Sequence, residues 1–268
     1  MSHSPLASIH PEAKIGANVI IEPFATIKSN VVIGDNCWIG PNAIIWEGAR
    51  LGKNVKAFPG ASISAMPQDL KFAGEDTETF IGDNTIVREY VTISKGTSDK
   101  FKTIVGSNCL LMAYVHVAHD CVVGNNCILA NAVQVAGHVH IEDFAIIGGA
   151  SALHQFVKVG AHVMISGGSL VRKDVPPFTK AAREPLTYAG VNSVGLRRRG
   201  FSPEKISEIQ EVYRYIFLKG LNNSKALDLV ENELLASEER DYIVSFIRTS
   251  ERGVMKGFTT KANSASVE

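Results

Sequence analysis

The chain has 268 residues, and its 27 basic residues balance its 27 acidic residues. Aromatic residues make up only 7% of the sequence, which favours many small, regular core layers over one core built around large rings. Without a net positive field, nucleic acid is a poor candidate for the main partner, although Arg197, Arg198 and Arg199 form one local basic cluster.

The N-terminal residues MSHSPLASIHPEAK contain no basic stretch followed by an apolar one. We therefore expect no secretory signal and a cytoplasmic protein. The longest stretch without charged residues runs from Cys121 to Ile141. Its Asn, Gln and His side chains are strongly disfavoured in the core of a bilayer, so we expect no membrane span.

A period of six residues runs from Ile9 to Val171. Of the 28 positions in this phase, 24 hold Ile, Leu or Val and one holds Ala. The exceptions, Asp69, Glu75 and Asp99, indicate two loops that leave the repeat. Because six is not a multiple of 3.6, the pattern predicts short stacked strands, as in a parallel β-helix, and not an α-helix. Three hexads form one triangular coil of 18 residues, so we expect nine coils in residues 9–171.

A small or β-branched residue follows most of these aliphatic residues by four positions, and we expect it to pack beneath a corner. Gly and Asn between the two sites suit tight corners that need positive φ. All four cysteines occupy the small inward site: Cys37, Cys109, Cys121 and Cys127. Buried apolar packing is therefore expected for them, in preference to metal binding, a catalytic thiol or a disulfide framework.

The six-residue phase disappears after Pro176 and Pro177, and helical spacing follows. Ser202 and Pro203 predict the start of a first helix, and Gly220 suits its end.

Ser224 predicts the cap of a second helix, and a third helix is expected from Glu238 to Ser250. We expect a β-helical domain at 1–190, a helical domain at 191–256 and a disordered polar tail at 257–268.

Residues that lie 18 apart become vertical neighbours in a triangular coil, so sequence spacing predicts a site. The spacing gathers seven residues near one corner: His116, His119, Asp120, Gly137, His138, His154 and Gln155. Taken alone, His116 or His154 is better explained as a hydrogen-bonded surface or interface residue. As a column they predict either a general base oriented by a carboxylate, or a zinc site like that of some β-helix carbonic anhydrases.

The motifs LLMAYVHVAHDC, CILAN, AGHV, DFAIIGG, LHQF, GAHVM, DVPP, GVN and RRRGFS occur in this order. With them, the chain resembles the UDP-N-acetylglucosamine O-acyltransferases of lipid A biosynthesis, which belong to the hexapeptide-repeat acyltransferase superfamily. The resemblance covers Ile9 to Phe217. It implies a mainly β fold, a left-handed parallel β-helix with a C-terminal α-helical domain. It also implies a homotrimer with active sites between neighbouring prisms, and neither cofactor nor metal.

The resemblance also implies a role for each matching residue. His119 would be the general base that takes the proton of the sugar 3-hydroxyl, as that oxygen attacks the thioester of a 3-hydroxyacyl chain on acyl carrier protein. Asp120 would orient His119, and the backbone N–H of Gly137 would stabilise the oxyanion. The implied substrate-binding residues are Gln68, Asp69, Lys71, His116, His138, His154, Gln155, Asn192, Arg198 and Arg199.

Gly167 matches the family's acyl-chain ruler, where a glycine leaves room for a long chain. Val194 stands where the family often has Glu, which puts that nucleotide contact in doubt. The arginine cluster also suits docking of the acidic carrier protein. The preferred chain length is left open, as is the choice between UDP-N-acetylglucosamine and its 3-amino analogue. The rival functions are a metal-dependent hydratase and a non-catalytic solenoid scaffold on the same fold.

Overall fold

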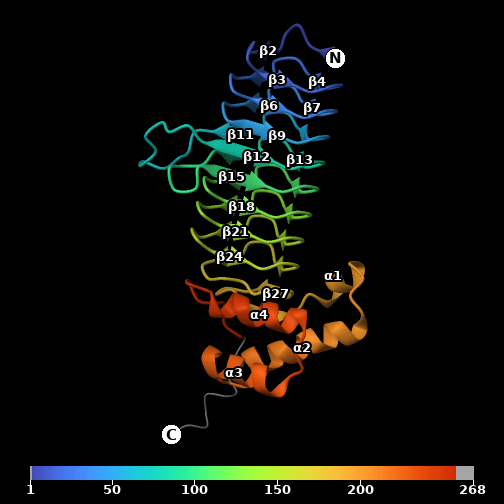
Figure 1. Ribbon diagram of the computed structural model, residues 1–268, viewed down its shortest axis with the longest axis vertical. Helices are drawn as coiled ribbons and strands as arrows, with labels where there is room; N and C mark the ends of the chain where they lie inside the picture. Colours follow the sequence, from blue (N-terminus) through green and yellow to red (C-terminus); the bar gives the residue numbers. More distant parts are fainter. Residues whose placement is uncertain (1, 258–268) are drawn as a thin grey trace.

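The chain winds into a tall prism of stacked coils, with its helices gathered at the C-terminal end (Figure 1). The structure is a computed structural model and describes residues 2–257. Apart from Gly257, the tail that was expected to be disordered lies outside the described residues. Within the described residues, no helix is long and apolar enough to cross a membrane.

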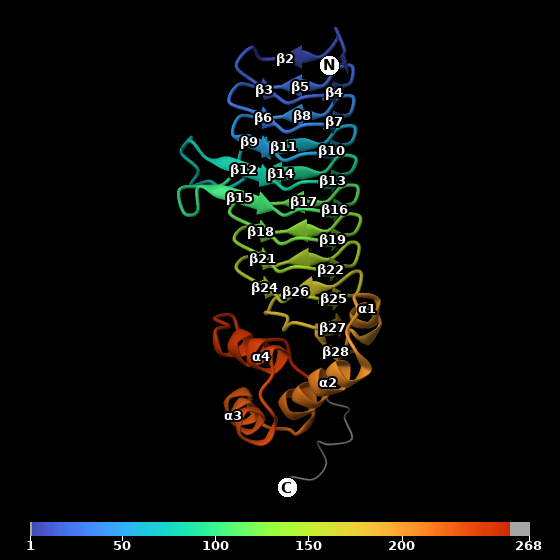
Figure 2. The same ribbon diagram turned by 45° about the vertical axis from the view of Figure 1, so that its right-hand side comes forward.

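Each coil contributes one short strand to each of three sheets, here called A, B and C in the order in which the chain visits them (Figure 2). Sheet A contains β1 (Ser2–His3), β4 (Ile20–Ile21), β7 (Trp38–Ile39), β10 (Lys56–Ala57), β13 (Ile86–Val87), β16 (Leu110–Leu111), β19 (Ile128–Leu129), β22 (Ile146–Ile147), β25 (Met164–Ile165), β27 (Thr179–Ala182) and β28 (Thr187–Val191). Sheet B contains β2 (Ser8–Ile9), β5 (Thr26–Ile27), β8 (Ile44–Ile45), β11 (Ser62–Ala65), β14 (Thr92–Ser94), β17 (His116–Val117), β20 (Gln134–Val135), β23 (Ala152–Leu153) and β26 (Leu170–Val171). Sheet C contains β3 (Lys14–Ile15), β6 (Val32–Ile33), β9 (Ala49–Leu51), β12 (Glu78–Ile81), β15 (Lys102–Val105), β18 (Val122–Val123), β21 (His140–Ile141) and β24 (Lys158–Val159).

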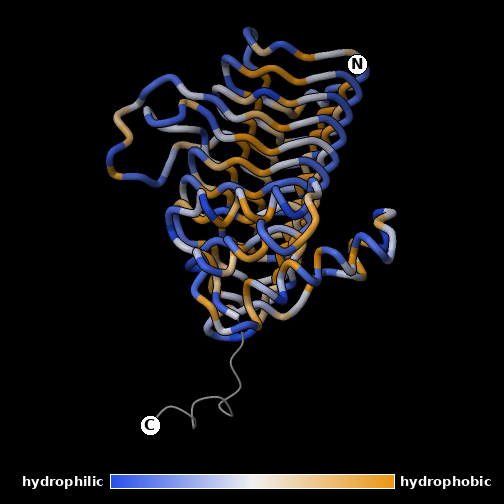
Figure 3. Tube along the Cα trace, turned by 60° about the horizontal axis from the view of Figure 1, so that its bottom comes forward, coloured by the Kyte–Doolittle hydropathy of each residue, from blue (hydrophilic) through white to orange (hydrophobic). Residues whose placement is uncertain are grey.

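The aliphatic residue of each hexad points into the prism and the residue before it points out. Ile21, Ile39 and Val87 in sheet A are at most 1% exposed, and apolar and polar segments alternate along every coil (Figure 3). The small sites are buried as well, including all four free cysteines. The predicted inward packing of the cysteines is therefore confirmed.

Two loops leave the prism at the corner between sheets B and C (Figures 1 and 2). The regular register joins residues 18 apart, as in Val117 opposite Val135. At the loops, Ile63 lies opposite Ile93, and Ile93 opposite Val117. The extra residues form the loops 66–77 and 95–101 and together use the length of one coil. The expected nine coils are therefore wrong: the nine strands of sheet B bound eight turns of the winding.

Tight corners of the prism use the left-handed backbone conformation. Six asparagines in one column, at the corner between sheets C and A, have φ between 55° and 59°: Asn18, Asn36, Asn54, Asn84, Asn108 and Asn126. Asparagine tolerates this conformation better than most residues. Their side chains also hydrogen-bond vertically, with Asn84 Nδ2 donating to Asn108 Oδ1 at 3.1 Å.

The C-terminal end is more complex than predicted. An antiparallel hairpin of β27 and β28 closes sheet A, and the short helix α1 (Ser193–Arg198) follows it. Neither was expected, because neither continues the six-residue phase.

The three expected helices are α2 (Pro203–Leu218), α3 (Asn223–Glu233) and α4 (Glu238–Arg248). Ser202 caps α2 as predicted. The predicted cap Ser224 is wrong, because Asn222 caps α3 by accepting the N–H of Lys225 at 2.9 Å.

Candidate active site

The predicted histidine column lies at the corner between sheets B and C, on the coils that follow the two loops. Three successive coils turn this corner at residues 119–120, 137–138 and 155–156. The second turn residue of each coil has positive φ: Asp120 at 58°, His138 at 62° and Phe156 at 65°. The winding therefore stacks three turns of one type, and the two loops of the preceding coils fold over the same corner.

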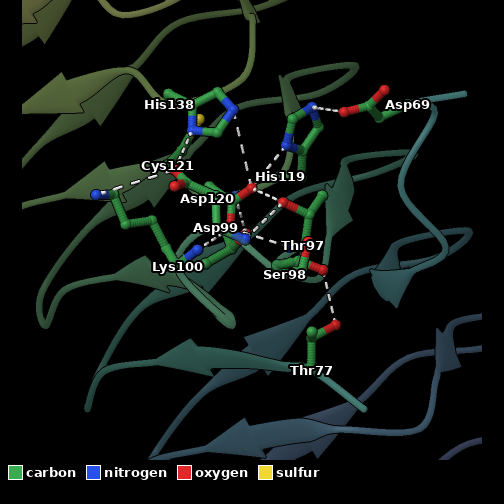
Figure 4. Close-up of polar contacts among 12 residues, drawn as sticks. Asp69, Thr77, Thr97, Ser98, Asp99, Lys100, His119, Asp120, Cys121 and His138 are labelled. Carbon is green, nitrogen blue, oxygen red and sulfur yellow. Dashed lines mark hydrogen bonds and ion pairs between the residues drawn. The ribbon is translucent and has the colours of Figure 1, made fainter. Parts of the chain in front are cut away.

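His119 and Asp120 form a buried pair. His119 Nδ1 lies 2.8 Å from Asp120 Oδ2 (Figure 4), and both residues are at least 94% buried. Nε2 of His119 faces the loop 66–77, where Asp69 Oδ2 lies 3.9 Å away. An ionised carboxylate only accepts hydrogen bonds, so Nδ1 carries the proton and Nε2 keeps its lone pair.

The carboxylate of Asp120 receives further donors from the loop 95–101. Thr97 donates its backbone N–H to Oδ1 at 2.9 Å and its hydroxyl to Oδ2 at 2.6 Å. Lys100 donates its N–H to Oδ1 at 3.2 Å. Burial raises the pKa of Asp120, but the hydrogen bonds from Thr97 and His119 outweigh it and leave the pKa below its usual value.

Sequence reasoning missed Thr97 and Lys100. The only signal was the break in phase at Asp99, which indicated a loop but not where its donors would lie.

His138 completes a cluster of rings. Its ring meets that of His119 edge-on at 5.0 Å between centroids and stacks on Phe156 at 4.5 Å. Nδ1 of His138 lies 3.1 Å from Asp99 Oδ2, although the geometry does not satisfy a directed hydrogen bond and Nδ1 has no other partner. The contact between His138 and Asp99 is an ion pair only when the imidazole is protonated.

Gly137 lies directly against the imidazole of His119. A Cβ atom added to Gly137 would come within 2.7 Å of both Cε1 and Nε2 of His119. In the described chain, the backbone N–H of Gly137 donates to no protein atom, so it is available to a ligand. The structure therefore explains this glycine by the close approach of the imidazole of His119.

A groove of about 330 Å³ opens beside His119. It is lined by Gln68, Ser94, His116, Ala118, His119, Gln134, Val135, Ala136, Gly137, Ala152, Leu153 and Gln155. A second hollow, of about 300 Å³, is lined by Asp69, Lys71, Glu75, Thr97, Ser98, Asp99, His138 and Phe156. The structure thus gathers most of the predicted site residues around two hollows that meet at one corner.

His116 and His154 differ in their surroundings. His116 lies on β17, where its Nδ1 is 2.7 Å from Thr92 Oγ1. Burial lowers the pKa of His116, and the charge of His119, when that ring is protonated, lowers it further; both effects favour a neutral hydrogen-bonding ring. His154 is exposed, and its Nδ1 lies 3.2 Å from the backbone oxygen of Gln155.

The predicted nucleotide-binding residues lie at another corner, between sheets C and A. Asn192 caps α1 and donates its Nδ2 to the His162 backbone oxygen at 2.9 Å. Arg199 donates to the Phe144 backbone oxygen at 3.0 Å, and burial lowers its pKa. Arg198 is exposed. Within one chain, these residues belong to a different edge of the prism from His119.

Gly167 lies at the third corner, between sheets A and B. An added Cβ there would lie 3.1 Å from the Gly149 backbone oxygen. The three groups of predicted residues therefore occupy three separate edges of one prism.

The cysteines offer no reactive thiolate at this site. Cys121 directly follows Asp120 in the chain, but burial raises its pKa to about 12. Burial also raises the pKa of Cys37 to about 11. The thiolate form of Cys121, the cysteine next to Asp120, is therefore disfavoured.

Comparisons with known proteins agree with this geometry. A family model described as UDP-N-acetylglucosamine O-acyltransferase, domain 2, matches residues 174–255, and a bacterial transferase hexapeptide model matches residues 30–56 and 102–137. The acyl–(acyl carrier protein)–UDP-N-acetylglucosamine O-acyltransferase of Aquifex aeolicus is 56% identical over 198 residues, which cover 74% of this chain and 76% of the relative. A Chlorobaculum parvum protein of the same name is 55% identical over 198 residues, covering 72% and 74% of the two chains.

Solved structures agree as well. A UDP-N-acetylglucosamine acyltransferase from Bacteroides fragilis superposes with a TM-score of 0.93 at 56% identity, covering 94% of this chain and 99% of that one. The Arabidopsis UDP-N-acetylglucosamine acyltransferase superposes with a TM-score of 0.81 at 32% identity, covering 94% and 99%.

Proposed function

Because the chain belongs to the UDP-N-acetylglucosamine O-acyltransferase family, with its left-handed parallel β-helix, we propose that it transfers a 3-hydroxyacyl chain from acyl carrier protein to the 3-hydroxyl of UDP-N-acetylglucosamine. This is the first step of lipid A biosynthesis. The observation that carries the proposal is the buried pair of His119 and Asp120 beside an open groove.

In the proposed reaction, Nε2 of His119 takes the proton of the sugar hydroxyl while its oxygen bonds to the thioester carbon. The resulting oxyanion accepts the free N–H of Gly137. The carbon–sulfur bond then breaks, and the leaving thiolate takes the proton back from His119. The 3.9 Å gap between Nε2 and Asp69 is too long for a hydrogen bond, and it leaves Nε2 available to a hydroxyl.

We propose that the active enzyme is a homotrimer with sites between prisms. The outward residues of sheet A in its lower coils are large, aliphatic and partly exposed: Ile86, Leu110, Ile128, Ile146 and Met164. An apolar stripe of this kind suits a subunit interface. A threefold arrangement would also bring Asn192 and Arg199 of one prism toward His119 of another.

The basic residues of α1, in the helical domain proposed at 191–256, suit docking of the acidic carrier protein. Arg197 and Arg198 lie in the last turn of α1 and are exposed. Four buried free thiols agree with a reducing compartment, and we propose that the protein is cytoplasmic.

The hydratase alternative has one observation in its favour. One ligand atom each of His119, Asp120 and His138 lie within 4.8 Å of one another. The carboxylate of Asp120, however, already accepts four hydrogen bonds, and a metal would have to displace some of them. A zinc-to-subunit ratio near one in active protein would favour the hydratase.

Acyl transfer is tested with His119→Ala. Loss of a general base lowers turnover by about a hundredfold or more, measured as acyl transfer from 3-hydroxyacyl carrier protein to UDP-N-acetylglucosamine. His10→Ala, at an exposed position, is the control. Substantial turnover by His119→Ala would rule out the base assignment.

A panel of donors with different chain lengths, tried on both sugar nucleotides, decides length and acceptor. If no donor supports acyl transfer, the non-catalytic solenoid scaffold remains as the alternative function.

A further inference from the structure

Asp120 depends on the loop 95–101 for its orientation. Its side chain is fully buried, and a buried charge is costly unless hydrogen bonds compensate it. Its own backbone N–H donates to Thr103 Oγ1 at 2.9 Å, which anchors the main chain of the turn. The carboxylate group itself is held mainly by Thr97, which donates once to each oxygen.

The hydroxyl of Thr97 has a single proton, which it donates to Asp120. Its oxygen lies 3.3 Å from the backbone N–H of Asp99, which donates to it. The single hydroxyl proton is therefore free to donate to Asp120 Oδ2. Oδ2 is also the oxygen that receives His119 Nδ1–H, so Thr97 and His119 act on the same atom.

The loop that carries Thr97 is itself fastened at several points. Thr77 donates its hydroxyl to the Gly96 backbone oxygen at 2.7 Å in a buried contact. Glu75 Oε1 accepts the N–H of Ser98 at 2.9 Å. Both bonds join the segment that follows Asp69 to the loop 95–101, so the two loops hold each other over the corner.

We infer that Thr97 is a positioning residue, which locks the carboxylate of Asp120 so that His119 keeps its proton on Nδ1 and its lone pair on Nε2. The inference rests on the proposed acyl transfer, since it concerns the same base. With Thr97 present, the carboxylate is held at both oxygens and remains an acceptor toward Nδ1. Without the hydroxyl, one restraint on its rotation is lost, and the other tautomer of His119 becomes accessible.

Thr97→Val tests this, because valine keeps the shape and the backbone N–H and removes only the hydroxyl. Loss of one hydrogen bond to a charged group is expected to lower kcat by about tenfold or more. KM for both substrates should stay within about twofold, since the hydroxyl bonds to Asp120 and Thr97 does not line the groove beside His119. Thr97→Ser keeps the hydroxyl and should restore most of kcat.

Thr85→Val is the matched control. Thr85 is fully buried, donates its hydroxyl to the Gly106 backbone oxygen at 2.7 Å and accepts the N–H of Cys109 at 3.1 Å. Thr85→Val therefore loses one donated and one accepted hydrogen bond, as Thr97→Val does, but at a different corner of the prism. Its kcat should equal that of the wild type even if its melting temperature falls.

Ring ¹⁵N NMR of His119, assigned by comparison with His119→Ala, reads the tautomer directly. The wild type should show the Nδ1–H form and Thr97→Val a mixture. Wild-type kcat together with an unchanged tautomer in Thr97→Val would overturn the inference, and Thr97→Ala provides the same comparison if the valine variant does not fold. If the wild type transfers no acyl chain, the proposed function fails, while the NMR result still decides the role of Thr97.

Discussion

At the scale of single residues, the geometry of the site requires a residue without a side chain at position 137. Gly137 has no left-handed φ, so its backbone would accept an alanine. The reason for glycine is the imidazole of His119, which occupies the space of a Cβ. Glycine therefore allows the proposed general base and the proposed oxyanion donor to lie in contact.

Gly137→Ala should disable the enzyme without unfolding it. The added methyl would lie 2.7 Å from Nε2 of His119 and would displace the ring, so kcat/KM should fall by about tenfold or more. Steady-state kinetics and thermal unfolding of the same protein measure the two effects. Wild-type activity at an unchanged melting temperature would show that His119 does not need its observed position.

At the scale of elements, the corner between sheets C and A changes its composition toward the C-terminus. The asparagine column gives way to an aromatic stack, in which His162 lies between Phe144 at 4.8 Å and Phe178 at 5.6 Å. Burial and then the charge of Arg199 lower the pKa of His162 to about 4, and Asp143 opposes the shift. The stack connects the prism to α1, but it buries one polar atom, His162 Nδ1, without a hydrogen bond.

His162→Phe should stabilise the protein, and more so in acid. Between pH 6.5 and about 4, the unfolded chain binds a proton that folded His162 does not, so the stability of the wild type falls as the pH falls through this window. Phenylalanine removes that loss and fits the positive φ of 60°, since Phe144 and Phe178 have 62° and 64° in the same column.

Thermal unfolding at pH 5 and pH 7.5 measures the difference. The gain in melting temperature should be larger at pH 5. His10→Gln, at an exposed histidine, is the control substitution, and an equal gain at both pH values for His162→Phe would contradict the assigned cause.

At the scale of the whole molecule, one prism separates the residues assigned to the proposed reaction. His119, Arg199 and Gly167 lie at three different corners. In the proposed homotrimer, a closed threefold ring would bring the Arg199 corner of one subunit to the His119 corner of its neighbour.

Mixing two inactive variants tests this arrangement. His119→Ala and Arg199→Ala homotrimers should each be nearly inactive. If subunits assort at random, about a quarter of the shared sites contain both native residues. Co-expressed protein should therefore regain about a quarter of wild-type activity, while separately purified and unexchanged trimers should not. No recovery in mixed trimers, with the trimer verified by light scattering, would place both residues in one subunit's site.

The sequence alone determined the features that follow the six-residue repeat. The six-residue phase predicted the coils, the buried cysteines and the histidine corner, because a fixed period converts distance along the chain into position on a lattice. It did not determine what lies outside the lattice. Thr97 reaches Asp120, and Asp99 reaches His138, through a loop with no period. The hairpin of β27 and β28, the helix α1 and the cap Asn222 likewise follow from local and long-range contacts that no repeat encodes. Only the tertiary structure decided these features, because the conformation of a loop depends on its contacts with the surface against which it packs.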